Sequence, residues 1–151
     1  MHPPMPAPAW TIRSATSEDA AAVLSLWSAA AVPAGVSDTP EGLAALLETD
    51  RDSLLLAESE RSVVGSLIAA WDGWRGSFYR LAVHPTRRRE GIATALLREG
   101  ESRLRDRGAL RLTAIVDDEE PLALEFWRDA GYDRQPNRVR FVRHLGRSDS
   151  S

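Results

Sequence analysis

The chain has 151 residues and a formal net charge of −3, with 43% hydrophobic and 27% charged side chains. These totals are typical of one ordinary globular domain, and the negative charge argues against nucleic-acid binding, which needs a basic surface. The sequence contains no cysteine, which excludes disulfides, thiolate catalysis and cysteine-based zinc sites, and no apolar run approaches the roughly 20 residues of a membrane span.

The first half of the chain predicts a strand, two helices and an antiparallel meander. Residues 10–14 alternate apolar and polar side chains, as a half-buried strand does. Two amphipathic helices are expected next, the first capped by Thr16 or Ser17 and the second opened by Pro40 at its first helical position. Three strands then follow at 53–57, 63–71 and 77–83, joined by turns at 58–61 and 72–76.

The second half carries the strongest helix pattern, at residues 92–107, with Gly108 as its C-terminal cap. A strand at 110–116, a helix opened by Pro121 and a last strand at 139–145 complete the order. This order predicts an α/β (α+β) fold with a mixed sheet of about six to seven strands and about four helices, with local parallel pairing. We expect one domain over 10–146, with disordered ends at 1–9 and 147–151.

The loop before the long helix predicts a phosphate site. The buried strand ends at Pro85, and an arginine-rich stretch, 87–89, leads to Gly91 at the start of the helix. The first turn of a helix leaves backbone N–H groups unpaired and carries partial positive charge, so a phosphate there accepts several hydrogen bonds. Gly91 and Ala93 leave room for the phosphate oxygens. An arginine-rich loop that contacts only water is the alternative.

Other phosphate-binding loops fit this sequence less well. A P-loop needs a lysine, and all 19 cationic side chains of this chain are arginine. The dinucleotide fingerprint needs three glycines in a fixed frame, and this loop has Gly91 alone.

The segment Arg88-Arg89-Glu90-Gly91-Ile92-Ala93 resembles the Arg/Gln-x-x-Gly-x-Gly/Ala signature of the GNAT N-acetyltransferases. The preceding residues 81–85 resemble the lead-in of that family, and Ala123–Tyr132 is similar to its Ala-x-x-Phe/Leu-Tyr-x-x-x-Gly-Phe/Tyr stretch. The order of elements matches as well. The resemblance covers roughly Trp10 to Leu145, and the Trp-Asp-Gly-x-Arg-Gly turn at 71–76 resembles one found in small bacterial members near the ribosomal-protein N-acetyltransferases.

The resemblance implies the GNAT fold and acetyl-CoA as co-substrate, with no metal. It implies that the pyrophosphate rests on the loop backbone, that the pantetheine arm pairs with the strand before the loop, and that a backbone N–H of that strand polarises the thioester. The implied cofactor-binding residues are Leu81, Ala82, Val83, Arg88, Arg89, Glu90, Gly91, Ile92, Ala93, Thr94, Phe126 and Trp127.

The family's usual acid, a tyrosine in the downstream segment, is replaced here by Trp127. An indole N–H is not a useful acid, so this role does not carry over. Tyr79 is one candidate replacement, with packing as the alternative, and Glu120 stands where the family often has asparagine, with a charged helix start as the alternative. Glu58 is a candidate to order a water that takes the amine's proton, and a water relay needs no dedicated residue. We do not expect His84 to act as a base.

The acceptor is expected to enter beside the first two helices. Trp27, Trp71, Trp74 and Tyr79 are candidates to line that groove, although the spacing of Trp27 also fits a core position. Acidic side chains at Asp72, Glu58 and 117–120 would attract a cationic amine, and a solvated acidic face is the alternative. The Trp-Asp-Gly-x-Arg-Gly turn at 71–76 favours a peptide or protein amine.

We therefore expect an N-acetyltransferase that moves acetyl from acetyl-CoA to a primary amine, a protein or peptide N-terminus or a small amine, by direct attack in a ternary complex. A non-catalytic acyl-CoA sensor is the alternative, and a nucleic-acid-binding module built on Arg87–Arg89 is a third reading. The proline-rich start lacks the pattern of a signal peptide, so we expect a cytoplasmic bacterial protein without nucleic-acid or membrane partners. Relatives often form homodimers, and no sequence feature decides the oligomeric state.

Overall fold

The computed structural model describes residues 9–146, which divide into two units: residues through Ile115, and residues from Val116. The expected disordered ends, 1–9 and 147–151, lie outside the described residues except for Ala9.

The first unit is built on a sheet of five strands in the order β1-β2-β3-β4-β5. The first four strands pair antiparallel with their neighbours, and β5 pairs parallel with β4. The expected mixed sheet is therefore confirmed, with fewer strands than the predicted six to seven. The strands are β1 (Thr11–Ser14), β2 (Leu54–Ser59), β3 (Ser62–Trp71), β4 (Gly76–Val83) and β5 (Leu112–Ala114).

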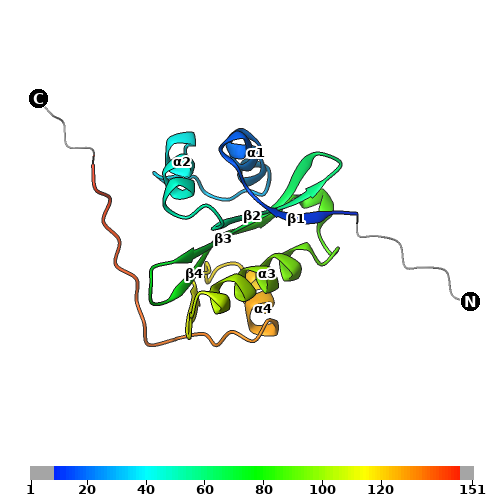
Figure 1. The fold of residues 1–151 in the computed structure, drawn as a ribbon. Coiled ribbons are helices and arrows are strands. Elements are labelled where there is room, and N and C mark those ends of the chain that lie inside the picture. The colour runs from blue at the N-terminus through cyan, green and yellow to red at the C-terminus, as the bar shows by residue number, and fades with distance from the viewer. Residues whose placement is uncertain (1–8, 147–151) are drawn as a thin grey trace, which may run out of the picture. The chain divides into compact units, whose positions relative to one another are not determined.

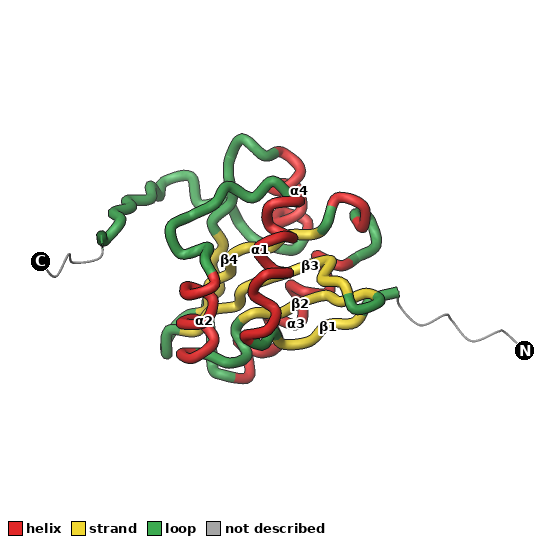
Figure 2. Tube along the Cα trace, turned by 90° about the horizontal axis from the view of Figure 1, so that it is seen from above, coloured by secondary structure: helices red, strands yellow, loops and turns green. Residues whose placement is uncertain are grey.

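Helices cover both faces of this sheet. Helices α1 (Ala20–Ala29) and α2 (Pro40–Thr49) lie on one face, and α3 (Ile92–Asp106) lies on the other (Figures 1 and 2). On the α1–α2 face, helix residues pack against inward-facing residues of β2, β3 and β4 to form a core; among its members are Val23, Leu26, Trp27, Leu43, Leu54, Leu56, Ile68 and Ala82. On the α3 face, the strands come so close to the helix that glycines are needed at the contacts.

Local chemistry explains where the helices start. Pro40 occupies the first turn of α2, and the hydroxyl of Thr39 accepts a hydrogen bond from Gly42 N–H at 3.0 Å, as an N-cap does. Before α1, the carboxylate of Asp19 accepts a hydrogen bond from Thr16 N–H at 2.7 Å and closes a short helical turn, Ser17–Asp19. The predicted start of α2 is confirmed, whereas the start predicted after Thr16 or Ser17 is a short helical turn and α1 itself begins at Ala20.

The predicted strand at 139–145 is wrong. None of the described residues from 130 to 146 forms a strand, and Val139 and Phe141 are 82% and 92% exposed. In the second unit, helix α4 (Pro121–Asp129) is the one regular element that the structure describes. Alternating side chains fit a half-buried strand, but a strand also needs a neighbour for its backbone groups, and the sequence pattern does not provide one.

The turn between β2 and β3 is shorter than predicted. Only Glu60 and Arg61 separate the two strands, and both have positive φ angles, 48° and 68°. Two positive φ angles define a tight turn that usually carries Asn-Gly or a similar pair. The pair Glu60-Arg61 is not typical of such a turn, so the sequence analysis predicted a longer turn over 58–61.

Arg13 joins β1 to two carboxylates. Its guanidinium binds Asp19 at 2.8 Å and Glu58 at 2.7 Å. The hydrogen bond from Arg13 is the main reason why the pKa of Asp19 is lowered from 3.8 to about 2. A carboxyl whose pKa is lowered by folding stabilises the protein above its unfolded pKa, and this stabilisation is lost as the pH falls through the folded value.

Asp19→Asn should therefore lower the free energy of unfolding by about 1 kcal/mol at pH 5, allowing for solvent screening of the partly exposed pair. The difference between the two proteins should shrink as the pH falls from 4 to 2, because Asp19 of the native protein becomes protonated there. Urea unfolding of both proteins at a series of pH values measures this difference. A difference that stays constant down to pH 2 would contradict the role of the ion pair.

Candidate functional site

Strand β4 has an edge that no strand covers over its second half. β5 pairs only with Gly76, Ser77 and Phe78, whereas β4 continues to Val83. Among the described residues, the stretch 79–83 therefore has a strand neighbour on the β3 side alone.

The direction of the backbone groups along this edge follows from one hydrogen bond. His84 N–H donates to Val64 O of β3 at 2.8 Å. Backbone groups of successive strand residues point to opposite sides, so those of Ala82 face β3, whereas those of Leu81 and Val83 face the open edge. Of the three strand residues predicted to bind the cofactor, two thus offer their backbone to an extended ligand.

The open edge leads into the loop that the sequence singled out. His84 Nδ1 accepts a hydrogen bond from Thr86 N–H at 3.2 Å and starts a single helical turn, Pro85–Arg87. Arg89 and Gly91 then have positive φ angles of 66° and 82°, and this compact loop ends at the N-terminus of α3. His84 therefore shapes the loop.

The N-terminus of α3 presents backbone donors. Gly91 is the N-cap residue and has no side chain to bond the first amides. The first helical hydrogen bond comes from Ala95 N–H to Gly91 O at 3.0 Å, so the amides of 92–94 precede it and lack helical partners. A Cβ on Gly91 would meet nothing within 4 Å, which leaves open space at the loop for a ligand. The side chain of Ile92 is buried in the core, so only its backbone faces this space.

Two arginines of the loop are left without carboxylate partners. Arg87 binds Glu90 through two hydrogen bonds of 2.7 and 3.0 Å; this pair lowers the pKa of Glu90 and raises that of Arg87. Arg88 and Arg89 are exposed, and the described part of the chain gives them no ion pair. Glu90 therefore holds the loop together, and Arg88 and Arg89 supply the net positive charge beside the helix N-terminus.

The peptide bond after Arg80 lies at an irregularity of β4. The register between β3 and β4 shifts between Ser66 and Ile68, so β4 carries one extra residue there, and Arg80 has a φ of 55°. The hydroxyl of Ser66 donates to Arg80 O at 2.8 Å. Sequence reasoning missed this feature, although one signal was available: Ser66 is the polar residue within an apolar strand, and a buried polar group needs a partner.

The candidate proton-transfer residues of the first unit differ in whether another group of the protein already binds them. Tyr79 is 48% exposed on β4 and pairs with Ile68 of β3. Glu58 is engaged, because Arg13 Nε donates to its carboxylate at 2.7 Å. Asp72 accepts hydrogen bonds from two amides of its own turn, at 2.8 and 2.6 Å. Tyr79 thus stays a candidate acid, and the two carboxylates are used for structure.

The four aromatic residues do not line one groove. Trp27 is only 3% exposed and belongs to the core, as its helical spacing suggested. Trp71 and Trp74 line a depression of about 400 Å³ with residues after α3, and this depression includes neither Trp27 nor Tyr79. Arg75 stacks over the Trp74 ring at 4.0 Å.

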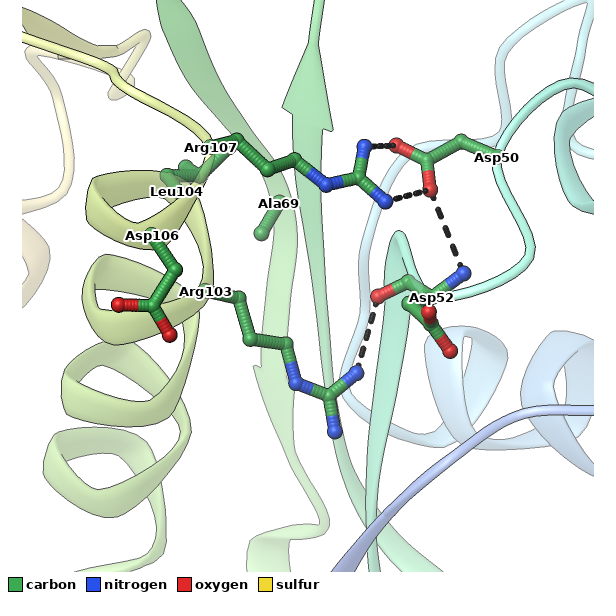
Figure 3. Close-up of a pocket in the computed structure, with 7 residues that line it drawn as sticks. All are labelled: Asp50, Asp52, Ala69, Arg103, Leu104, Asp106 and Arg107. Atoms are coloured by element: carbon green, nitrogen blue, oxygen red, sulfur yellow. Dashed lines mark hydrogen bonds and ion pairs between the residues drawn. The ribbon is translucent and has the colours of Figure 1, made fainter.

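A second depression, of about 370 Å³, lies at the C-terminal end of α3 (Figure 3). Its arginines are already paired: Arg107 holds the carboxylate of Asp50 at 2.8 and 2.9 Å, and Arg103 donates to Asp52 O at 3.1 Å. These contacts fasten the end of the helix to the start of β2. The depression lies at the end of α3 opposite to Gly91.

The remaining predicted site residues lie in the second unit. Glu120 is the residue before α4, and Phe126 and Trp127 lie within that helix. The Trp127 ring contacts the rings of Phe126 and Tyr132 edge to face, at 5.6 and 5.0 Å between centroids. Their roles toward the cofactor stay predictions.

Residues 9–146 contain neither a cluster of metal-ligating side chains nor a helix that could span a membrane. No group of three or more His, Cys, Asp or Glu side chains in this range is placed to hold a metal ion. No helix in this range is both long and apolar enough to cross a membrane.

Comparisons with known proteins agree with this architecture. The model of a family described as "Acetyltransferase (GNAT) family" matches residues 20–132. Among solved structures, Ard1 from Thermoplasma volcanium has a TM-score of 0.74 at 22% identity, with 82% of each chain covered. The PaiA N-acetyltransferase from Thermoplasma acidophilum, in complex with coenzyme A, has a TM-score of 0.71 at 16% identity, covering 83% of this chain and 91% of that one.

A third solved structure is more similar in sequence. A GNAT family acetyltransferase from Brucella melitensis, in complex with acetyl-CoA, is 28% identical over 85% of each chain, with a TM-score of 0.62.

Proposed function

Because the chain belongs to the acetyltransferase (GNAT) family, we propose that it transfers an acetyl group from acetyl-CoA to a primary amine by direct attack in a ternary complex. The observation that carries this proposal is the continuity of two features: the open edge of β4 over 79–83 runs directly into the loop and the free amides at the start of α3. A ligand with an extended arm and a diphosphate needs both features, side by side.

The residues present fit acetyl-CoA. Leu81 and Val83 would pair their backbone groups with the amide groups of the arm, as a neighbouring strand would. The amides of 92–94 would donate to the diphosphate, and Arg88 and Arg89 would add charge-assisted hydrogen bonds. When bound, acetyl-CoA supplies an acetyl thioester, which is activated enough for an amine to attack.

The chain's own contribution to the transfer is binding, orientation and charge stabilisation. Holding the amine and the thioester together in one site supplies much of the rate. The N–H of Leu81 points to the open edge and would donate to the carbonyl oxygen as negative charge develops there. The attacking nitrogen must lose a proton, through water, and Tyr79 is proposed to give a proton to the departing thiolate. Glu120 is proposed to contact the cofactor or the incoming amine.

For the acceptor we propose a peptide or protein N-terminus or a small amine, with the peptide amine favoured. This preference rests on the Trp-Asp-Gly-x-Arg-Gly turn at 71–76, which resembles a turn of small bacterial members near the ribosomal-protein N-acetyltransferases.

The double substitution Arg88→Glu and Gly91→Glu should weaken acetyl-CoA binding at least about 100-fold. It replaces a cation by an anion and places a second carboxylate where the diphosphate would lie, so two charge-assisted hydrogen bonds are lost and repulsion is added. Titration calorimetry measures the affinity. The matched control is Ser102→Glu with Arg105→Glu, which makes the same change of charge on exposed positions of α3 away from the loop.

The control variant should bind acetyl-CoA within about threefold of the native protein. Equal affinities of both variants, or no binding by the native protein, would contradict the proposed site. The same samples are then assayed for thiol release with peptides bearing free N-termini, a polyamine and an aminoglycoside. Release that requires an amine supports a transferase, whereas tight binding without release for every acceptor would instead favour an acyl-CoA sensor.

A further inference from the structure

One buried hydroxyl group lies on the β3 side of β4, opposite to its open edge. Ser66 of β3 is fully buried, with 0% of its surface exposed. Its Oγ accepts a hydrogen bond from Trp27 Nε1 of α1 at 2.8 Å and donates to Arg80 O at 2.8 Å. Since the indole nitrogen is a donor only, the hydroxyl hydrogen is directed to the carbonyl of Arg80.

That carbonyl belongs to the peptide unit that also carries Leu81 N–H. A trans peptide is planar, and its C=O and N–H point in opposite directions. No cis peptide bond occurs in the described chain. Holding Arg80 O toward Ser66 therefore fixes Leu81 N–H away from β3, which is the direction of the open edge deduced above from the strand pairing.

This peptide unit needs such a restraint. Arg80 is the extra residue of the irregularity, so its carbonyl lies outside the regular ladder. Its φ of 55° is a value that residues other than glycine rarely adopt, and this backbone conformation costs on the order of 1–3 kcal/mol. Such a conformation persists only where its surroundings fix it, and without a partner the plane would be free to rotate.

The side chain of Arg80 is held as well. Its guanidinium forms two hydrogen bonds with Asp38, of 3.1 and 2.6 Å, and Asp38 in turn accepts from Gly35 N–H at 2.6 Å. This cation keeps the pKa of Asp38 below its ordinary value, against the effect of burial. Arg80 is thus fixed at two points, its side chain by the segment between α1 and α2, and its carbonyl by Ser66.

We propose that Ser66 is a positioning residue for acetyl transfer: by holding the carbonyl of Arg80, it aims Leu81 N–H at the carbonyl oxygen of the thioester. The inference rests on the proposed function, in which Leu81 N–H stabilises the developing charge. Ser66 itself touches neither substrate. A donor that is fixed before the reaction needs no reorganisation as charge develops, and a small rotation of the peptide plane removes this advantage.

The test compares three variants of the full chain. Ser66→Ala removes the donor to Arg80 O; Ser66→Cys keeps a similar shape with a weaker donor. Trp27→Phe removes the other partner of the same hydroxyl and leaves the bond to Arg80 O in place. It also keeps an aromatic ring beside the Arg80 guanidinium, whose Cζ lies 5.7 Å from the Trp27 ring centroid, so it is the control for loss of stability. Three quantities are measured for each: the affinity for acetyl-CoA, kcat with saturating acetyl-CoA, and the backbone amide resonance of Leu81 in the free protein.

Ser66→Ala is expected to lower kcat by about 10-fold to 100-fold, the range that misplacement of a reacting group produces. Its affinity for acetyl-CoA should stay within about threefold, because Val83 and the loop still bind. Ser66→Cys should fall between Ser66→Ala and the native protein, and it carries the test if Ser66→Ala does not fold. The Leu81 amide resonance should move in both Ser66 variants and stay in place in Trp27→Phe, which should keep kcat within about threefold.

The inference is overturned if Trp27→Phe loses as much kcat as Ser66→Ala, or if the Leu81 resonance does not respond to Ser66. A different result, in which the native protein releases no thiol with any amine while the Leu81 resonance does follow Ser66, overturns the proposed transfer and leaves the positioning of the peptide unit supported. The two failures are therefore distinguishable.

Discussion

Replacing Gly65 by alanine should weaken acetyl-CoA binding at least about tenfold and lower the free energy of unfolding by about 2 kcal/mol, as overpacking of a core contact does. A Cβ on Gly65 would lie 2.7 Å from Ile92 Cγ2 and 3.1 Å from Leu96 Cδ1. Ile92 is the first residue of α3 and is 1% exposed. Because its Cγ2 branches directly from Cβ, it cannot turn away easily, so the helix must move off the sheet at the end that carries the free amides.

Gly76→Ala is the matched control for Gly65→Ala. A Cβ on Gly76 would lie 2.7 Å from Leu104 Cδ1, near the C-terminal end of the same helix, and 2.7 Å from Leu112 Cδ2. We expect this variant to lose stability by a similar amount but to bind acetyl-CoA within about threefold of the native protein. Thermal unfolding and calorimetry measure both quantities. Unchanged affinity in Gly65→Ala, or equal losses of affinity in both variants, would show that the position of the helix start does not depend on Gly65.

The largest loss of stability is expected for Leu67→Ala, about 3–4 kcal/mol, the cost of deleting a fully buried leucine side chain. Leu67 lies on β3 with 0% of its surface exposed. Its Cδ2 would be 3.1 Å from a Cβ on Gly100 of α3, so the substitution opens a cavity where the middle of the helix meets the sheet. Urea unfolding measures the loss.

A second substitution tests whether this cavity lies where the structure places it. Gly100→Ala alone crowds Leu67 and also Phe78, whose Cε1 would be 3.0 Å from the new Cβ. In a chain that already carries Leu67→Ala, the added methyl group enters the cavity instead. We expect the double variant to be more stable than the sum of the single effects predicts by about 1 kcal/mol. Strictly additive losses would contradict the close approach of α3 to β3.

The elements that the sequence predicted well are those whose signals are local. The periodicity of 92–107 gave α3 to within one residue, and Pro40 marked the start of α2. The apolar runs at 63–71 and 77–83 each gave a strand to within one residue of its observed start. In these segments the side-chain pattern and the local backbone preference agree, so no distant contact was needed to decide the structure.

The elements that sequence reasoning missed depend on partners distant in the chain. The alternation at 139–145 fits a strand, yet no described strand pairs with it. The strand predicted over 110–116 is reduced to Leu112–Ala114, because only these three residues pair with β4, and Leu110 is fully exposed. The irregularity at Arg80 has no local signal at all, since arginine does not favour a positive φ.

The candidate site likewise has one part that a local motif indicates and another part that depends on contacts between distant segments. The proposed phosphate-binding part is local, because a loop of a few residues and the first turn of one helix contain the amides and the charges, and the motif around Gly91 indicated where in the chain they lie. The proposed orientation of Leu81 N–H depends on Ser66, a residue of the neighbouring strand β3 that lies 15 positions earlier in the chain. The proton-transfer residues stay predictions, because their roles require contacts between distant segments that no short motif contains.

The open edge of β4 has a consequence for the behaviour of the protein in solution. Backbone groups kept free for a ligand are also free for any other extended chain, and exposed edges of this kind are where β-aggregation starts. The stretch 81–83 is apolar, and the nearest cation, Arg80, is occupied by Asp38. A bound pantetheine arm would occupy the free backbone groups of β4, and it has no second hydrogen-bonding edge to which another chain could add. The concentration of the co-substrate would then affect not only the rate of turnover but also how long the folded protein stays free of aggregates. For this reason we expect purified samples to remain monodisperse longer when they are stored with coenzyme A.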